Sequence, residues 1–488
     1  MKPQLNLIEN DPFAPFTDLG YGGYQGAVGR VAMHPFTIPA GIAKQIQQVT
    51  EALEKFSFAV NKLAIQSNKP FLQTMGHRVE DVIPRSCIRN PMHLFRPDMV
   101  WQGDKLFVTE IESAPGGHGF AAALQGASSS LVDMYVRLLT HPRTGEKKPF
   151  RVILTHRWGE YLFEQAYFCR RLAEKGVDAK VIVDAPLRDV QRRASQEWQK
   201  QDGVHLHWDV HIKQRLEHSN LMHYVEFQDG LPTRLDEGTY VFLMGYVRHW
   251  GKAGMQTLQQ LERAKVRIIN GANFIWSSKA LLAAVKMPIV RQAVLKHGGE
   301  EVLRVLDEHI APTWLLQHNP GMTMKELAAS EECRGSAGQP MYPWAASLDQ
   351  VLGAAQKRLV LKEAGNSMDE SDWGARGMWL GKDHPNDCHN RQVSWLECIT
   401  SATQDRKPFV VQELLHSQKF TVPCWEKGPD GAYPVDTPGL QRLRLTPFVV
   451  VSGRDVLCDA GIATFGTNVK VHGATDATMA KVEVAAET

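Results

Sequence analysis

Two alternating segments early in the chain define a β-hairpin. Residues 95–101 and 106–113 alternate apolar and polar side chains, and residues 102–105 between them have the Gly-Asp sequence of a tight turn. Because successive side chains of a strand point to opposite faces, Arg96 and Asp98 share one face. The pattern therefore predicts a hairpin with one apolar and one charged face.

Three carboxylates gather on the charged face. Glu110 and Glu112 share one face of the second segment, and either plausible turn length places Asp98 within about one register step of Glu110. Like charges this close repel, unless the face is fully solvated or a hard divalent cation lies among the oxygens. Both interpretations stay open at this point: a solvated face with one Arg96–carboxylate pair, or a site for Mg²⁺ that arrives with a nucleotide.

A lysine at a strand end marks a second region of interest. Residues 358–362 form a short apolar segment that ends in Lys362, and several glycines follow between residues 365 and 381. A lysine in this place can reach nucleotide phosphates, and glycines let backbone amides approach them closely. The same glycines would also suit an ordinary turn.

The next apolar segment, residues 408–415, is interrupted by Gln412 and Glu413. Two polar residues in a buried strand suit the rim of a cleft, where the strand backbone could bond an adenine edge and Glu413 could lie near a ribose hydroxyl. The alternative is a strand end that emerges into solvent.

Lys279 precedes an apolar helical run, residues 280–285. Ser277 or Ser278 is a suitable N-cap, so we expect Lys279 in the first turn of the helix. A cation there interacts unfavourably with the positive end of the helix dipole. Phosphate oxygens bound in the same site would explain why a lysine is present. A lysine that points into solvent is the alternative.

The middle of the chain predicts a small parallel sheet. An apolar strand at residues 151–155, a helix at 161–175 and a second strand at 179–183 form the start of a βαβ pattern. No Gly-x-Gly-x-x-Gly turn accompanies it, which disfavours a dinucleotide fold. A further helix is predicted near residues 42–67, and residues 286–330 are expected to be mainly helical.

Composition is typical of a large enzyme. The 488 residues are 43% hydrophobic and 22% charged, enough for two or three lobes with full cores. The formal charge is only +2, from 55 basic and 53 acidic residues, which gives no electrostatic reason to expect a nucleic acid or a membrane surface as partner. With no signal-peptide or membrane-spanning pattern, we expect a cytoplasmic protein.

In this order along the chain, the motifs resemble those of the circularly permuted ATP-grasp enzymes, and most closely the synthetase part of glutathionylspermidine synthases. The resemblance extends over roughly residues 70–465 and rests on five short motifs. It implies an α+β or α/β fold with a Rossmann-like pre-ATP-grasp domain. The implied domains are a helical leader with the metal-binding hairpin (1–150), the pre-ATP-grasp substrate domain (151–285) and the nucleotide-binding lobe (286–475).

The resemblance also implies roles for individual residues. Asp98, Glu110 and Glu112 match the family's Mg²⁺ ligands, although the family often has asparagine where this chain has Glu112. The remaining matches are Arg96 as the phosphate-contacting arginine, Lys279 and Lys362 as the nucleotide-phosphate lysines, and Gln412 and Glu413 on the adenine side.

The implied activity is an ATP-dependent ligase that joins a carboxylate to an amine through an acyl-phosphate, with ATP and Mg²⁺ as cofactors. Small carboxylates and amines would be its partners. This chemistry requires no protein nucleophile, and no serine or cysteine triad stands out. Arg442 or Arg444 could contact the acyl-phosphate, with structural ion pairing as the alternative. Two other functions stay open: a phosphotransferase on the same scaffold, and a nucleotide-binding protein without turnover.

Overall fold

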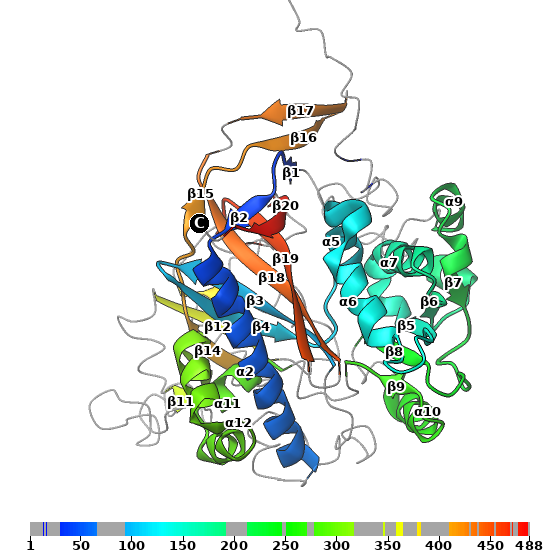
Figure 1. Cartoon of the computed structure of the whole chain (residues 1–488), viewed down its shortest axis with the longest axis horizontal. Helices are drawn as coiled ribbons and strands as arrows, with labels where there is room; N and C mark the ends of the chain where they lie inside the picture. The colour runs from blue at the N-terminus through cyan, green and yellow to red at the C-terminus, as the bar shows by residue number, and fades with distance from the viewer. Residues whose placement is uncertain are drawn as a thin grey trace, which may run out of the picture.

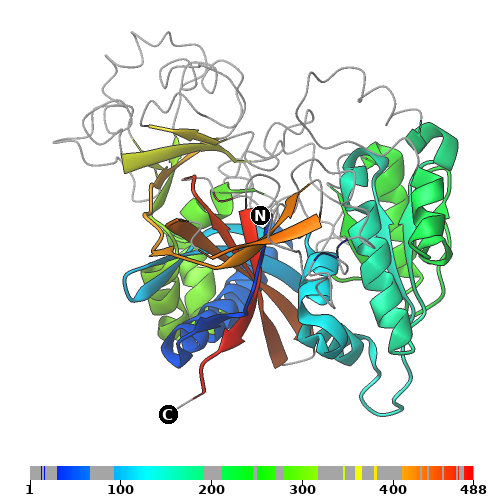
Figure 2. The ribbon, with the colours of Figure 1, turned by 90° about the horizontal axis from the view of Figure 1, so that it is seen from above.

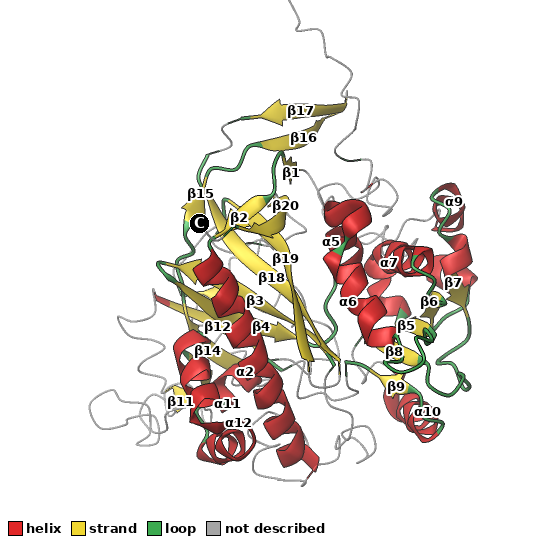
Figure 3. Cartoon of the chain, viewed as in Figure 1, coloured by secondary structure: helices red, strands yellow, loops and turns green. Residues whose placement is uncertain are grey.

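The computed structural model contains three β-sheets with helices packed against them (Figures 1 and 3). It describes residues 13, 16, 30–65, 93–191, 212–245, 250–270, 278–316, 345–346, 358–364, 378–381, 409–428, 431–436, 439–452, 455–468, 471 and 477–486. The fold is therefore of the mixed α and β class that the sequence predicts.

The central sheet joins strands from both ends of the chain. Its main path is β17-β16-β1-β20-β19-β18-β3-β4, with β15 paired to β18 and β2 paired to β20. The strands are β1 (Arg30–Ala32), β2 (Phe36–Ile38), β3 (Leu94–Gln102), β4 (Lys105–Glu112), β15 (Lys419–Phe420), β16 (Cys424–Gly428), β17 (Gly431–Val435), β18 (Gln441–Ser452), β19 (Asp455–Gly466) and β20 (Ala477–Val484). Segments predicted as parts of two lobes, 1–150 and 286–475, thus contribute to one sheet.

Strands β3 and β4 confirm the predicted hairpin. Gly103, with φ of 63°, and Asp104 make the two-residue turn between them. Asp98 lies directly opposite Glu110 and Arg96 opposite Glu112, with a bulge after Asp98. The apolar side chains of Phe95 and Met99 are fully buried, as the alternation predicts.

Two long helices cover one face of this sheet. In α2 (Ala40–Ile65), apolar residues recur at helical spacing and are buried against α12 (Pro288–His309) and the strands. The predicted helix at 42–67 is thus confirmed. The expectation of a mainly helical segment over 286–330 is wrong after His309, because residues 313–316 form a strand; 317–330 lie outside the described residues.

A second, five-stranded sheet carries the predicted nucleotide-binding strands. Its order is β11-β10-β14-β12-β13, and all pairs are antiparallel except β10 with β11. The strands are β10 (Thr313–Leu316), β11 (Ala345–Ala346), β12 (Leu359–Glu363), β13 (Met378–Leu380) and β14 (Phe409–Glu413). The short helix α11 (Ala280–Ala284) packs against β10 and β14.

The third sheet is parallel throughout, which confirms the prediction from the βαβ pattern. Its order is β7-β6-β5-β8-β9. The strands are β5 (Phe150–Leu154), β6 (Ala179–Val183), β7 (Val225–Phe227), β8 (Tyr240–Met244) and β9 (Arg267–Ile268), and the main helices are α7 (Leu162–Glu174), α9 (Ile212–His218) and α10 (Gly251–Arg263).

Helices α5 (His118–Gln125) and α6 (Ser130–Leu139) stand between the central sheet and the parallel sheet (Figures 1 and 2). Both contact central strands on one side and α7 on the other. A second apolar core fills this junction, with Tyr135, Phe150, Phe168 and Phe448 fully buried. Among the described residues, no helix has both the length and the apolar character needed to cross a membrane.

Candidate active site

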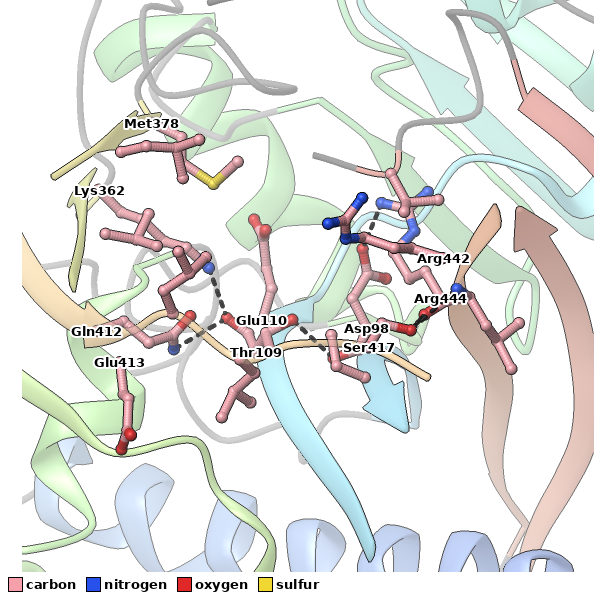
Figure 4. Close-up of a pocket in the computed structure, with 17 residues that line it drawn as sticks. Asp98, Thr109, Glu110, Lys362, Met378, Gln412, Glu413, Ser417, Arg442 and Arg444 are labelled. Atoms are coloured by element: carbon pink, nitrogen blue, oxygen red, sulfur yellow. Dashed lines mark hydrogen bonds and ion pairs between the residues drawn. The ribbon is translucent and has the colours of Figure 1, made fainter. Parts of the chain in front are cut away.

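A cleft lies where the charged hairpin β3–β4 meets strands β12 to β14 and β18 (Figure 4). Its lining combines charged and polar side chains with apolar ones. The charged and polar lining residues are Asp98, Thr109, Glu110, Lys362, Gln412, Glu413, Ser417, Arg442 and Arg444; the apolar ones are Val100, Val360, Met378, Leu380, Leu414, Leu415, Leu443 and Val471.

The carboxylates of the hairpin are held by arginines. Arg96 lies 3.1 Å from Asp98 (Nε to Oδ1) and 2.7 Å from Glu112 (Nη2 to Oε2). Arg444, on β18, lies 3.0 Å from the other oxygen of Asp98 (Nη1 to Oδ2). Only 5% of the Asp98 side chain is exposed, so the alternative of a fully solvated hairpin face is wrong.

Burial governs the ionisation of this cluster. Burial raises the pKa of Glu112, and Arg96 opposes part of that rise; the side chain keeps 31% of its surface exposed, so water moderates the shift. Burial alone would lower the pKa of Arg96, but Glu112 and Asp98 raise it on balance. Arg96 is therefore a permanent cation beside Asp98 and Glu112.

Lys279 contacts a carboxylate of the hairpin from the start of helix α11. Its Nζ lies 3.1 Å from Glu110 Oε1, and only 10% of its side chain is exposed, so the solvent-pointing alternative is wrong. The helix begins one residue later than expected: Lys279 is the N-cap residue of α11 and not part of its first turn. The Ser278 hydroxyl accepts a hydrogen bond from the Ala280 amide at 3.3 Å.

Lys362 is buried in β12 and points toward β4. Its Nζ donates a hydrogen bond to the Thr109 carbonyl at 3.1 Å. Burial lowers its pKa to about 8, and the nearby charge of Glu110 opposes that change. Lys362 thus lies beside the acidic hairpin although 253 positions separate it from Thr109 in the sequence. The predicted glycine loop that follows it is outside the described residues from 365 to 377.

Gln412 is oriented by two partners. Its Nε2 donates to Thr313 Oγ1 at 2.9 Å and lies 3.3 Å from the Thr109 carbonyl. Strand β14 pairs with β10 on one side and β12 on the other, so an adenine edge cannot bond its backbone at Gln412. Leu414 and Leu415 follow the strand and line the cleft, but the Leu414 amide already donates a hydrogen bond to the Arg358 carbonyl at 2.7 Å.

Glu413 is exposed at the end of β14. Figure 4 shows its carboxylate directed away from Thr109, Lys362 and Gln412. Contact with a ribose hydroxyl stays a prediction.

The carboxylates of the hairpin suit Mg²⁺ only when a bound substrate supplies further oxygen atoms. Within the described ranges, no three His, Cys, Asp or Glu side chains lie together as a metal site. Asp98, Glu110 and Glu112 are nevertheless hard oxygen ligands on one side of the hairpin, and Mg²⁺ is commonly bound by one or two carboxylates plus substrate phosphates. Their assignment as ligands stays a prediction.

The structure brings together the acidic hairpin, Lys279, Lys362 and Gln412, as the sequence predicts. Sequence reasoning missed the Thr109 carbonyl as their shared acceptor, because backbone groups leave no trace in a sequence pattern. It also missed Met378, Leu380 and Val471. Of the two arginines that the sequence offered as acyl-phosphate contacts, Arg444 forms an ion pair with Asp98, which is the structural alternative.

No protein-family model matches the chain, and no curated protein sequence matches it significantly. Several solved structures are similar to it, including two from different organisms. A glutathione synthetase-like effector from Globodera pallida, in its apo form, is 12% identical, with a TM-score of 0.44 over 93% of this chain and 90% of the other. A protein from Methylobacillus flagellatus KT, named provisionally as a gamma-glutamylcysteine synthetase, is 11% identical, with a TM-score of 0.41 over 90% and 87%. Likeness at this level carries no argument about function, which rests on the site itself.

Proposed function

We propose that the protein is an ATP-dependent carboxylate–amine ligase that forms an amide through an acyl-phosphate and releases ADP and phosphate. One observation carries the proposal. Lysines from two distant segments contact the early hairpin beside one cleft: Lys279 reaches Glu110, Lys362 reaches the Thr109 carbonyl, and Glu110 and Lys362 both line the cleft. In such a cleft, the cationic side chains can bind a triphosphate and the carboxylates can bind its divalent cation.

The proposal includes the fold family. The order of the motifs along the chain and their convergence support a circularly permuted ATP-grasp enzyme, similar to the synthetase part of glutathionylspermidine synthases. In this assignment the nucleotide lies between the central sheet and the antiparallel sheet, and the parallel sheet belongs to a Rossmann-like pre-ATP-grasp domain. The partners would be small carboxylate and amine substrates.

The two kinds of lining residue suit the two halves of ATP. An adenine ring would lie against apolar side chains such as Met378, Leu380 and Leu414. The phosphates would lie toward Lys362 and Glu110. Because Lys279 and Arg96 are engaged with carboxylates in the free protein, phosphate binding would exchange each of these ion pairs for a contact with the ligand.

Asp98, Glu110 and Glu112 would hold Mg²⁺. When bound, the ion neutralises negative charge that builds on the phosphate oxygens. Arg96, Lys279 and Lys362 add fixed positive charge around the same oxygens, in a setting where most of their own surface is removed from water.

The reaction has two steps. An oxygen of the substrate carboxylate attacks the γ-phosphorus of ATP, the bond to the β–γ bridging oxygen breaks, and ADP leaves. The amine nitrogen then attacks the carbonyl carbon of the acyl-phosphate, the C–O bond to phosphate breaks, and inorganic phosphate leaves. The protein's contribution is position and charge, with no covalent intermediate on a side chain.

The test is to incubate the protein with MgATP and pools of carboxylates and amines, and to measure ADP together with a mass gain that corresponds to condensation. We expect ADP release to require a carboxylate and product formation to require both substrates. Asp98→Ala and Lys362→Ala should each abolish turnover in folded protein. Full ADP release without any amine, with a phosphorylated product, would indicate a phosphotransferase instead.

A further inference from the structure

A second polar cluster lies at the carboxyl edge of the parallel sheet. The chain runs from β5 outward to β6 and β7, and then returns to place β8 and β9 on the other side of β5. The strand order therefore reverses between β5 and β8. Open α/β sheets bind ligands outside the carboxyl ends of their strands at such a reversal.

Three side chains from the segments that follow β5, β6 and β8 meet there. Asp184, directly after β6, is 4% exposed, and its Oδ1 accepts hydrogen bonds from the His156 amide at 2.6 Å and from His156 Nδ1 at 2.9 Å. Its Oδ2 accepts from Trp250 Nε1 at 2.6 Å. Burial alone would raise the pKa of Asp184, but the bonds from His156 and Trp250 lower it on balance.

These contacts fix the tautomer of His156. An ionised carboxylate only accepts hydrogen bonds, so Nδ1 must carry a proton. In the neutral ring, Nε2 is then a hydrogen-bond acceptor. The side chain of His156 is 38% exposed, in contrast to that of Asp184, so a ligand can reach it. The carboxylate and neutral imidazole together carry one negative charge beside an indole ring, a combination that attracts an ammonium group.

The same edge abuts the charged hairpin. The short helix η4 (His156–Tyr161) starts at His156 and ends at Tyr161. The ring of Tyr161 packs so closely on Gly116 that a Cβ there would lie 2.2 Å from Cε1. Gly116 in turn accepts a hydrogen bond from Arg96 at 2.6 Å. At the same end of β3, the Ile269 carbonyl, directly after β9, accepts a hydrogen bond from the His93 amide.

The ligase reaction needs a proton acceptor other than the carboxylates of the hairpin. An ammonium substrate must lose a proton before its nitrogen can attack, yet each carboxylate of the hairpin is already paired with a cation. We propose that His156 binds the ammonium group of the amine substrate and accepts its proton, while Asp184 and Trp250 act as positioning residues. This inference rests on the proposed ligase function.

The proton transfer is balanced within the reaction. Neutral His156 takes one proton from the ammonium group at Nε2 and becomes imidazolium, which leaves a neutral amine. The amine nitrogen attacks the acyl carbon, the C–O bond to phosphate breaks, and the second nitrogen proton leaves with the phosphate. His156 returns its proton to solvent.

The test compares two nucleophiles in His156→Gln. Hydroxylamine is small and uncharged at neutral pH, so it traps an acyl-phosphate as a hydroxamate without a base. We expect His156→Gln to form hydroxamate and release ADP within about twofold of the wild type, and to form amide from the ammonium substrate about 10²-fold more slowly. Asp184→Asn should lower the amide-to-hydroxamate ratio in the same direction, because it disturbs the tautomer.

A matched control is His141→Gln, which replaces an exposed histidine on the loop after α6 that bonds only within its own turn. It should leave both products unchanged. Equal amide and hydroxamate rates in His156→Gln would overturn the inference, and so would a loss of both products in folded protein. If the wild type itself forms neither hydroxamate nor ADP, the ligase function is wrong and the inference falls with it.

Discussion

The two five-stranded sheets present polar groups in opposite ways. In the antiparallel sheet, Lys362 and Gln412 are buried within strands β12 and β14. In the parallel sheet, residues 152–154 and 241–244 are almost completely buried and apolar, and the polar groups His156 and Asp184 follow the strand ends.

The difference has a physical origin. A charged group inside a strand loses its hydration and needs a partner from another element, as Lys362 finds in the Thr109 carbonyl. A parallel sheet covered on both faces leaves no room for such groups along its strands. Its polar site is assembled by strand order at one edge. Substitutions in the cleft should therefore alter ADP release most, whereas a substitution of the tightly packed Gly245 after β8 should alter packing.

Asp98→Asn should have the largest effect. It removes the charge that Arg96 and Arg444 share, and we expect ADP release to fall about 10³-fold and stability to fall by about 3 kcal/mol. Turnover of the folded fraction and a urea unfolding curve measure the two effects. Asp104→Asn, an exposed residue of the same hairpin turn, is the control. Near-normal turnover in Asp98→Asn would remove the hairpin from the active site.

Lys362→Met should separate activity from stability. ADP release should fall about 10²-fold. In the folded wild type, Lys362 loses its proton at about pH 8. In the unfolded chain it keeps its proton up to its ordinary, higher pKa. Between these two values the unfolded state binds more protons, so the stability of the folded state rises with pH. Relative to Lys362→Met, the wild type should gain about 3 kcal/mol between pH 8 and pH 10.5.

Denaturant unfolding across that pH range is the measurement, with the exposed Lys105→Met of the same hairpin as the comparison. Parallel stability curves for the wild type and Lys362→Met would mean that Lys362 is not buried as a charge.

Gly245→Ala probes the parallel edge. Gly245 has φ of 151°, and a Cβ there would lie 2.6 Å from Thr155 Cγ2. We expect a loss of about 2 kcal/mol in unfolding free energy, with unchanged MgATP affinity of the folded protein. Gly41→Ala, where a Cβ meets nothing within 4 Å, is the control. Equal thermal midpoints for the two variants would contradict the tight approach of β5 and β8.

Thr313→Val should have the smallest effect. Gln412 would lose the hydrogen bond to Thr313 at 2.9 Å but keep the one to the Thr109 carbonyl. We therefore expect the free energy of unfolding to fall by about 1 kcal/mol, and half-saturation to require a several-fold higher concentration of MgATP. Thr257→Val, on the exposed side of α10, should change neither. A loss of all turnover in Thr313→Val would mean that Gln412 does more than shape the lining of the cleft.

Local patterns predicted the elements well. The alternation around a Gly-Asp turn gave the β3–β4 hairpin with Asp98 opposite Glu110, and the βαβ pattern gave the parallel pair β5 and β6. Errors arose where a boundary depended on neighbours. Lys279 is an N-cap and not a first-turn residue, and the strand after α12 forms because β14 and β11 pair with it.

The sequence by itself determined which residues carry charge and which face of each strand they occupy, because the periodicity of a strand or helix is local. It also placed acidic groups early and the lysines late. Only the tertiary structure decided that they meet, since the pairing of β3 with β18 and the packing of β12 against β4 are contacts between segments hundreds of residues apart. The Asp184–His156–Trp250 cluster shows the same limit. Its members follow three different strands, and the order of strands in the sheet, which no local pattern encodes, brings them together.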